Sequence, residues 1–163
     1  MTSTVKLMRT VFADLVTSAL DTDPRLAVVT ADISASAFDE ARARHPDRVL
    51  NLGIREQALI GVAGGLGLAG MRPVVHSYTP FLVERPFEQI KLDLGHQDVG
   101  AVLVSTGASY DGARSGRTHQ APGDVAAIGA LPGWTVHVPG HPDELEHAFR
   151  SALPGDERVY VRM

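Results

Sequence analysis

Apolar residues along the chain follow two alternating patterns, one with helical spacing and one of short continuous runs. Between positions 5 and 20 they recur every three or four residues, which predicts a helix packed on one side. The run at 26–30 is almost wholly apolar, as in a strand buried on both faces. Along the whole chain the two patterns predict helices at 5–20, 35–44, 56–70, 86–94, 124–131 and 142–153, and strands at 26–30, 48–52, 72–76, 99–105, 134–138 and 158–161.

This alternation of helices with buried strands predicts an α/β fold for a single domain spanning residues 1–163. We expect a three-layer αβα sandwich around a mostly parallel sheet, because continuous apolar strands are typical of parallel sheets covered on both faces. In such sheets ligands bind beyond the carboxyl ends of the strands. The positions just past those ends are Asp32, Ile54 with Glu56, 76–81, 106–119 and 139–141, and they hold most of the unusual polar residues.

One carboxylate stands at the start of the most apolar predicted helix. Gly53 ends the preceding strand, Glu56 opens the helix, and the residues up to Gly70 are almost all apolar or glycine. A helix that is apolar all round is buried, and a Glu is seldom buried without a partner. Glu56 is therefore either a first-turn residue favoured by the helix dipole or a functional carboxylate that meets a ligand.

Two other motifs carry less weight. Residues 65–70 spell G-x-G-x-x-G, but a helix precedes them and a strand follows, the reverse of a dinucleotide-binding site. His137 and His141 have metal-like spacing, yet Pro139 and Gly140 prevent a helix that would put both rings on one face. We therefore expect glycine-mediated helix packing in the first case, and surface histidines without a metal in the second.

A long polar loop at 108–121 contains a histidine. Loops of this length in compact domains are often functional, and histidine titrates near neutrality, which suits proton transfer. His119 is therefore either a solvated loop residue or a proton-transfer group. Phe81 and Phe87, near the end of the third strand, are most simply core residues, with an aromatic platform for a flat ring as the alternative.

The composition excludes several classes of function. The 163 residues are 44% hydrophobic and 21% charged, which is ordinary for a soluble globular domain. The net charge is -4 and no basic run occurs, so nothing indicates nucleic acid binding. The absence of cysteine excludes disulfides and thiolate catalysis. No apolar run reaches membrane-spanning length and no apolar signal core occurs, so we expect a cytoplasmic protein without a membrane partner.

Four short segments, at 30–34, 53–58, 81–90 and 118–120, occur in this order at predicted strand ends. They match the motifs A-D-(L/V)-(T/S), G-I-(R/A/S)-E-(Q/H)-A, F-x-x-x-R-x-(Y/F)-(D/E)-Q-(I/V) and T-H-Q. Each match is weak alone, but together the four resemble the pyrimidine-binding domain of the transketolase family of thiamine diphosphate enzymes. The resemblance runs along essentially the whole chain and implies that domain's fold.

The resemblance implies a pyrimidine-binding subunit or domain of a transketolase-like transferase that moves a two-carbon ketol unit between small-molecule substrates. Its cofactor would be thiamine diphosphate with Mg²⁺. The ion would be held by a diphosphate-binding partner subunit or domain in a homo- or hetero-oligomer, since no Gly-Asp-Gly signature and no metal ligand occur here. The alternatives are a deoxyxylulose-phosphate-synthase-like or 2-oxoacid dehydrogenase beta-like subunit, or a non-catalytic partner module of the same fold.

The resemblance also implies roles for individual residues. Glu56 would hydrogen-bond N1′ of the aminopyrimidine, Phe81 would stack on that ring, and His119 would assist proton transfer at the substrate. Glu56 and His119 are thus the expected catalytic residues. The implied cofactor-binding set is Asp32, Ile54, Glu56, Phe81, Arg85 and Phe87, and the implied substrate set is Ser36, Arg114, Ser115, Arg117 and His119.

The substrate-facing positions depart from the family pattern. Two phosphate-binding arginines, a substrate histidine and an acidic residue of the family are replaced here by Val5, Val138, Gly107 and Ser115, while Ser36 alone of the phosphate set is kept. Arg114 and Arg117 are either substitute cations or plain surface charge. Because arginine offers a fork of donors that valine lacks, the chain is expected to hold a sugar phosphate poorly.

Overall fold

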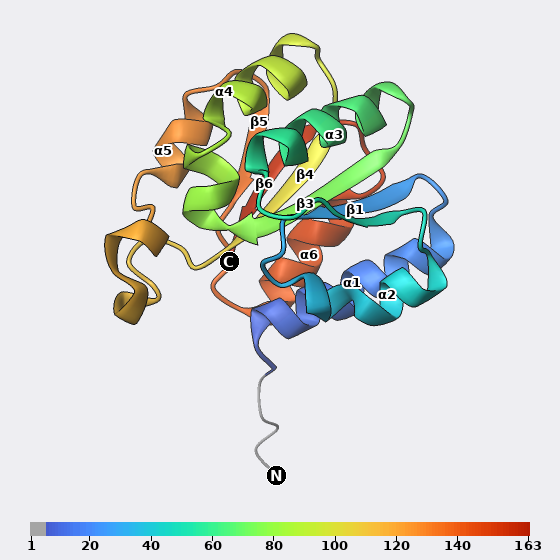
Figure 1. Ribbon diagram of the computed structural model, residues 1–163, viewed down its shortest axis with the longest axis horizontal. Helices are drawn as coiled ribbons and strands as arrows, with labels where there is room; N and C mark the ends of the chain where they lie inside the picture. The colour runs from blue at the N-terminus through green and yellow to red at the C-terminus, as the bar shows by residue number, and fades with distance from the viewer. Residues whose placement is uncertain (1–5) are drawn as a thin grey trace.

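The computed structural model describes residues 6–163 and forms one parallel sheet of six strands (Figure 1). Val5, one of the positions expected to replace an arginine, lies outside the described residues. The strand order is β2-β1-β3-β4-β6-β5. The strands are β1 (Leu26–Thr30), β2 (Val49–Asn51), β3 (Arg72–Tyr78), β4 (Ala101–Thr106), β5 (Trp134–His137) and β6 (Arg158–Arg162).

Helices cover both faces of the sheet, which confirms the predicted three-layer αβα fold (Figure 1). One layer, below the sheet in Figure 1, contains α1 (Met8–Thr22), α2 (Asp39–Arg44) and α6 (Pro142–Ala152). The other contains α3 (Glu56–Leu68), α4 (Phe87–Gln89) and α5 (Asp124–Gly129). Shorter turns are 3₁₀-helical at η1 (Ala35–Phe38) and η4 (Ala113–His119), and π-helical at η2 (Pro80–Glu84) and η3 (Ile90–His96).

Alternating strand residues divide the core into two hydrophobic clusters, one on each face of the sheet. Val28 of β1 is level with Val74 and Val102, and all three pack in the cluster that contains the rings of Phe12 and Phe149. The residues next along each strand pack in the cluster that contains Leu59, Ile90 and Ile128. Because the central strands are in register, their carboxyl ends reach the same edge of the sheet.

The helix predicted at 86–94 begins earlier than expected, with a helical turn at Pro80. Pro80 takes the first-turn position, where the missing N–H of proline costs nothing. Pro86 then lies inside the helical stretch, where it cannot donate to the ladder. The chain accommodates it with a wide turn, in which the amide of Arg85 donates to the carbonyl of Pro80 five residues earlier (3.0 Å).

The apolar helix α3 is buried on one face only, so the expectation that it is buried all round is wrong for this chain alone. Leu59 and Ile60 are fully buried against the sheet, whereas Ala58 is exposed and Leu68 is 60% exposed. The glycines do serve helix packing, because a Cβ at Gly64 would lie 2.8 Å from the carbonyl oxygen of Asp93. The outward face of α3 meets no other element within residues 6–163, which leaves an apolar surface open.

Within residues 6–163, no helix combines the length and the hydropathy needed to cross a membrane.

Candidate functional site

The buried carboxylate expected at Glu56 has a charged partner. Glu56 opens α3 with only 2% of its side chain exposed, and its Oε1 accepts a hydrogen bond from Nη1 of Arg85 (2.6 Å). Gln57 helps to place Arg85, since its amide donates to the backbone carbonyl of that residue (3.2 Å). The pair joins the start of α3 to the end of the π-helical turn η2, two segments that both lie at the carboxyl edge of the sheet.

A second contact of Arg85 extends the site to Phe81. The guanidinium carbon of Arg85 lies 4.1 Å from the centroid of the Phe81 ring, so a flat cation covers one face of that ring. The imidazole of His119 meets the same ring edge to face, with centroids 5.1 Å apart and planes at 71°. Glu56, Arg85, Phe81 and His119 therefore form one continuous chain of contacts, although they come from three separate segments of the sequence.

The tautomer of His119 follows from its neighbour. The hydroxyl of Thr118 donates its one proton to the carbonyl of Ser115 (3.1 Å) and also lies 2.9 Å from Nδ1 of His119. Because that proton is already used, Nδ1 of the neutral imidazole must be the donor in the second contact. Nε2 is then the nitrogen that can accept a proton, as a proton-transfer group requires.

Tyr78 is a site residue that the sequence patterns did not indicate. Its ring is T-shaped against His119, with centroids 5.7 Å apart, and tilted against Phe81 at 6.4 Å. Gly107 faces it with φ +75°, and a Cβ at Gly107 would lie 2.4 Å from the Tyr78 ring. The ring of Tyr78 therefore fills the space that a side chain at position 107 would need.

Asp32 and Ile54 lie just past the ends of β1 and β2, at the same edge of the sheet. The Asn51 side chain links Asp32 to Gly53, the residue before Ile54: its Oδ1 accepts from the amides of Asp32 (2.9 Å) and Gly53 (3.1 Å), and its Nδ2 donates to the Asp32 carboxylate (3.0 Å). Both linked backbones have positive φ, 60° at Asp32 and 69° at Gly53. Asn51 thus fixes a turn that leaves Ile54 69% exposed. In the sequence, only the position of Asn51, two residues before Gly53, indicated that it fixes this turn.

Of the other expected site residues, Ser115 joins this chain of contacts, since its carbonyl accepts from the Thr118 hydroxyl beside His119. The rest make no such contact within residues 6–163. Ser36 is exposed on η1, and Phe87 is half-buried on α4. Arg114, Ser115 and Arg117 are exposed in η4, on the loop that carries His119. Within residues 6–163 neither Arg114 nor Arg117 forms an ion pair.

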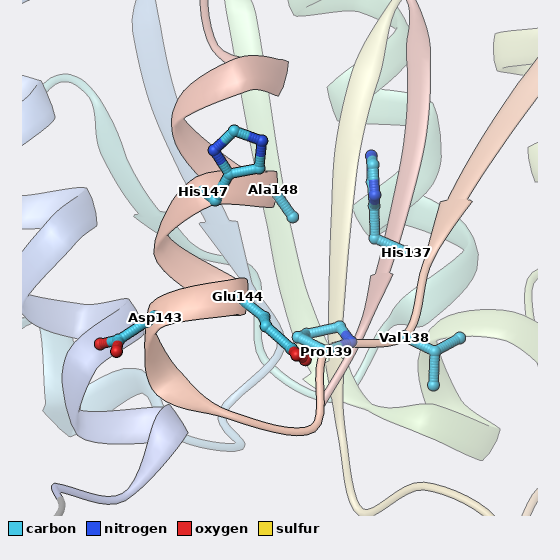
Figure 2. A pocket seen from close by; sticks show the side chains of 7 residues that line it. All are labelled: His137, Val138, Pro139, Asp143, Glu144, His147 and Ala148. Carbon is cyan, nitrogen blue, oxygen red and sulfur yellow. The ribbon is translucent and has the colours of Figure 1, made fainter.

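A hollow of about 450 Å³ lies between the end of β5 and the start of α6 (Figure 2). His137 and His147 stand on its two sides, and Val138, which is 55% exposed, lies at its rim. Among the described residues that line it, none is arginine or lysine. His141 does not join His137, because its Nδ1 accepts from the amide of Asp143 and so caps α6. No group of three or more His, Asp or Glu side chains in residues 6–163 is arranged to hold a metal ion.

The position of Asp124 at the start of the helix predicted at 124–131 predicts a helix cap, and this prediction is wrong. Gly123 occupies the cap position, and the Asp124 side chain is fully buried instead. It accepts hydrogen bonds from the hydroxyl of Tyr160 (2.6 Å) and from Nε of Arg162 (2.9 Å). Two donors on a neighbouring strand therefore hold the carboxylate inside the protein, and helix-start patterns in the sequence do not reveal such partners.

Comparison with known proteins identifies the family to which this fold belongs. The family model described as "Transketolase, pyrimidine binding domain" matches residues 6–163, and the chain belongs to this family. The resemblance of the four sequence segments is thereby confirmed. The roles of the individual site residues stay predictions.

Two curated relatives and one solved structure show which members of the family this chain is similar to. An uncharacterized 33.6 kDa protein in the fasciation locus of Rhodococcoides fascians is 56% identical over 96% of this chain and 50% of its own length. The 6-deoxy-6-sulfo-D-fructose transketolase subunit SqwH of Clostridium sp. (strain MSTE9) is 30% identical over 96% of this chain and 49% of its own. A split gene transketolase solved as an inactive beta4 tetramer has a TM-score of 0.85 at 28% identity, covering 98% of this chain and 52% of that one. The chain spans about half the length of the curated relatives it matches.

Proposed function

We propose that this chain is the pyrimidine-binding subunit or domain of a transketolase-like enzyme that uses thiamine diphosphate to transfer a two-carbon ketol unit. The observation that carries the proposal is the buried carboxylate of Glu56, bonded to a flat group that is stacked on Phe81. Membership of the family supports the cofactor. A partner chain or domain would bind the diphosphate and Mg²⁺.

The contacts of Arg85 test whether an aminopyrimidine fits this place. The guanidinium is flat, lies 4.1 Å from the Phe81 centroid and donates to Glu56 at 2.6 Å. An aminopyrimidine is also flat, and with a proton on N1′ it would make the same stacking contact and the same hydrogen bond. The Arg85 side chain is 39% exposed and can withdraw to solvent. The residues present therefore fit the group, and Arg85 occupies its contacts in this chain.

Each side chain then has a distinct task. When bound, thiamine diphosphate supplies an acidic thiazolium C–H whose carbon becomes the nucleophile. Glu56 would hold a proton at N1′ of the pyrimidine in a site that water hardly reaches, and Phe81 would keep the ring flat against it. His119, with Nε2 available, would accept and return a proton of a substrate hydroxyl.

The chain is proposed to act only with a partner. One relative is by its name a transketolase subunit, and another was solved as an inactive beta4 tetramer. The exposed apolar face of α3, with Ala58 and Leu68, supports a contact with a second chain, since single-chain proteins rarely leave a large apolar face open. The chain alone should therefore bind thiamine diphosphate weakly and show no turnover.

The substitution Glu56→Gln tests the function. In the enzyme assembled with its partner, it should slow proton exchange at C2 of the thiazolium by about 10²–10³, because glutamine keeps the shape but cannot stabilise a protonated N1′. Deuterium exchange read by NMR after acid quench measures this step. Glu84→Gln, on the exposed side of the neighbouring turn, is the matched control and should exchange normally. Normal exchange in Glu56→Gln would contradict the proposal, and no exchange in the wild type would favour a non-catalytic module.

The substrate is proposed to be bound without a strong phosphate site. Val138 lies at the rim of a hollow whose described lining residues include no arginine or lysine, and the Tyr78 ring closes the space above Gly107. Arg114 and Arg117 are the cations nearest in sequence to His119 and would meet an anion placed differently, with Ser36 and Ser115 as further polar contacts. The name of the SqwH subunit refers to a sulfo sugar, which supports an anion other than phosphate.

This substrate proposal predicts a weak preference for phosphorylated acceptors. The measurement is kcat/KM for ribose 5-phosphate and glyceraldehyde 3-phosphate against the unphosphorylated sugars, in the presence of the partner chain. We expect less than a hundredfold difference. A larger preference, which corresponds to more than about 2.7 kcal/mol of transition-state binding, would mean that a phosphate site exists elsewhere in the pocket.

A further inference from the structure

A buried ion pair lies at the base of the loop that carries His119. Arg162, at the end of β6, donates from Nε to the fully buried carboxylate of Asp124 (2.9 Å). Its Nη2 also donates to the hydroxyl of Ser109. One guanidinium thus contacts two points that are 15 residues apart in the sequence.

These two points are the two ends of the loop. Ser109 lies just after β4, and Asp124 is the first residue of α5. A backbone bridge closes the loop at the same level, with the amide of Ala121 donating to the carbonyl of Ser109 (3.0 Å). His119 is two residues before this bridge. Arg162 therefore contacts both ends of the loop, close to the bridge and to the segment that carries His119.

A second set of bonds holds Asp124 in place. The hydroxyl of Tyr160 donates to the same carboxylate oxygen (2.6 Å) and in turn accepts from the hydroxyl of Ser105 (2.8 Å). Burial, and then the neighbouring carboxylate, raise the pKa of Tyr160, so the phenol stays a donor. The Asp124 carboxylate is therefore held by two strands of the sheet, β4 through Ser105 and β6 through Tyr160 and Arg162.

Stability alone does not account for this arrangement. A buried ion pair gains little over apolar residues of the same volume, because both charges lose their hydration. Here the other oxygen of Asp124, Oδ1, is also buried and has no hydrogen-bond partner within residues 6–163. Such a network is more effective at holding groups in one geometry than at stabilising the fold.

We propose that Arg162 and Asp124 are positioning residues that tie the two ends of the His119 loop together and so hold the imidazole against Phe81 and Tyr78. The effect on catalysis rests on the proposed function. The mechanical effect on the loop does not, and it can be measured on the chain itself.

Trypsin measures the loop directly, because Arg114 and Arg117 are exposed cleavage sites within it. Cleavage after these residues in the native chain requires local opening, and its rate follows the population of the open form. Ser109→Ala removes one contact of Arg162 and should raise the rate about fivefold, as expected for one lost hydrogen bond. Arg162→Gln removes both contacts and should raise it further. Fragments are identified by mass spectrometry.

The matched control is Arg158→Gln, at the opposite end of the same strand. Arg158 pairs with Asp98 at 2.7 Å and its side chain is 14% exposed, against 15% for Arg162. This variant should leave loop cleavage within about twofold of the wild type, since it loses a similar pair far from the loop. Cleavage after Lys91, on η3, reports global unfolding in Ser109→Ala and Arg162→Gln. In Arg158→Gln it also reports η3 itself, because Arg158 donates to the carbonyl of Leu94.

Two results would overturn the proposal. The first is unchanged loop cleavage in both Ser109→Ala and Arg162→Gln, and the second is equal acceleration in Arg158→Gln. If Arg162→Gln also raises cleavage after Lys91, the variant unfolds globally, and Ser109→Ala decides the question because it leaves no charge unpaired.

A kinetic measurement separates positioning from a merely structural role. In the enzyme assembled with its partner, Ser109→Ala should lower kcat and leave the half-saturating cofactor concentration unchanged, because Glu56 and Phe81 lie outside the loop. A fall in kcat together with an equally large rise in the half-saturating cofactor concentration would contradict the positioning role. A wild-type protein without turnover would contradict the proposed function, while the trypsin result would still decide whether the ion pair holds the loop.

Discussion

At the amino end of the sheet, Arg72 is fully buried at the start of β3, and its guanidinium donates only to backbone carbonyls. Nε and Nη2 reach Ala152 (3.1 and 2.6 Å), and Nη1 reaches Glu157 (2.7 Å). At the carboxyl end, Arg85 pairs with the carboxylate of Glu56 instead. Arg72 thus joins α6 to β6, whereas Glu56 could exchange Arg85 for a different partner.

Buried polar atoms without a hydrogen-bond partner within residues 6–163 occur at both ends of the sheet. They are Nε2 of His76, Oγ of Ser77 and Oδ1 of Asp124 at the carboxyl end, and Nε1 of Trp134 and Nε of Arg158 at the amino end. The contrast therefore lies in the arginines themselves. Arg72 has a carbonyl for each of its three nitrogens, and complete satisfaction favours a rigid fold. Arg85 is 39% exposed and makes a side-chain pair in which the contacts can be replaced. The comparison teaches that a fully satisfied charge serves the scaffold and an exchangeable charge serves the site.

The largest effect that can test this contrast is expected from Arg72→Met. The substitution removes the donors of the buried Ala152 carbonyl and of the part-buried Glu157 carbonyl, and it should lower the free energy of unfolding by about 4 kcal/mol. Glu56→Gln at the carboxyl end should change it by less than about 1 kcal/mol, because glutamine can still accept from Arg85 and no buried charge remains. Urea unfolding followed by circular dichroism measures both.

Arg25→Met is the control for Arg72→Met, since it also lies at the amino end but is 40% exposed. This substitution should lower the free energy of unfolding by less than about 1 kcal/mol, as expected for the loss of exposed ion pairs. If Glu56→Gln destabilised the chain as much as Arg72→Met, the two ends would not differ in the way described.

A smaller effect is expected on the stability of the fold at acidic pH. Burial lowers the pKa of His76 from 6.5 to about 4, although the Val104 carbonyl, 2.7 Å from Nδ1, partly opposes it. The unfolded chain therefore binds the proton first, and stability is lost as pH falls from 6.5 towards 4, by about 3 kcal/mol in total. Above pH 6.5 this group should have no effect.

The midpoint of urea unfolding between pH 4 and 7 measures this loss. His76→Asn keeps a donor for Val104 but does not titrate, so the wild type should lose more stability than this variant as the pH falls. A wild type and a His76→Asn variant with parallel pH dependence would show that His76 does not make this end of the sheet sensitive to acid.

Much of the fold followed from sequence because its strands are buried on both faces and its helices are separated by glycine or proline. The run at 26–30 could only be a buried strand, and the start of α3 at Glu56 was found to the residue. The start of the turn at Pro80 was missed, since proline at 86 also suits a first turn. The apolar spacing did not reveal the π-helical turn, in which i→i+5 hydrogen bonds add one residue to the helical turn.

The candidate site was also predicted only in part from the sequence. The carboxylate of Glu56 could be predicted to need a partner, because burial of a charge is visible in an apolar pattern. The identity of that partner depends on the width of the turn between Phe81 and Arg85, which the pattern does not contain. Asp124 was misread for a similar reason: an aspartate at a helix start has a local explanation, and its real partners lie on a strand more than 30 residues away.

The contact between Tyr78 and Gly107 limits which substitutions such chains can acquire. A side chain at 107 needs the volume that the Tyr78 ring now fills, and it also needs a backbone with a positive φ angle, +75° here, that only glycine adopts easily. The two positions are therefore linked: a side chain at 107 is harmful until Tyr78 has become smaller. Anyone who wished to engineer an imidazole at 107 into this pocket would have to shorten Tyr78 first, and a lineage that acquires it must pass through an ancestor with a smaller residue at 78.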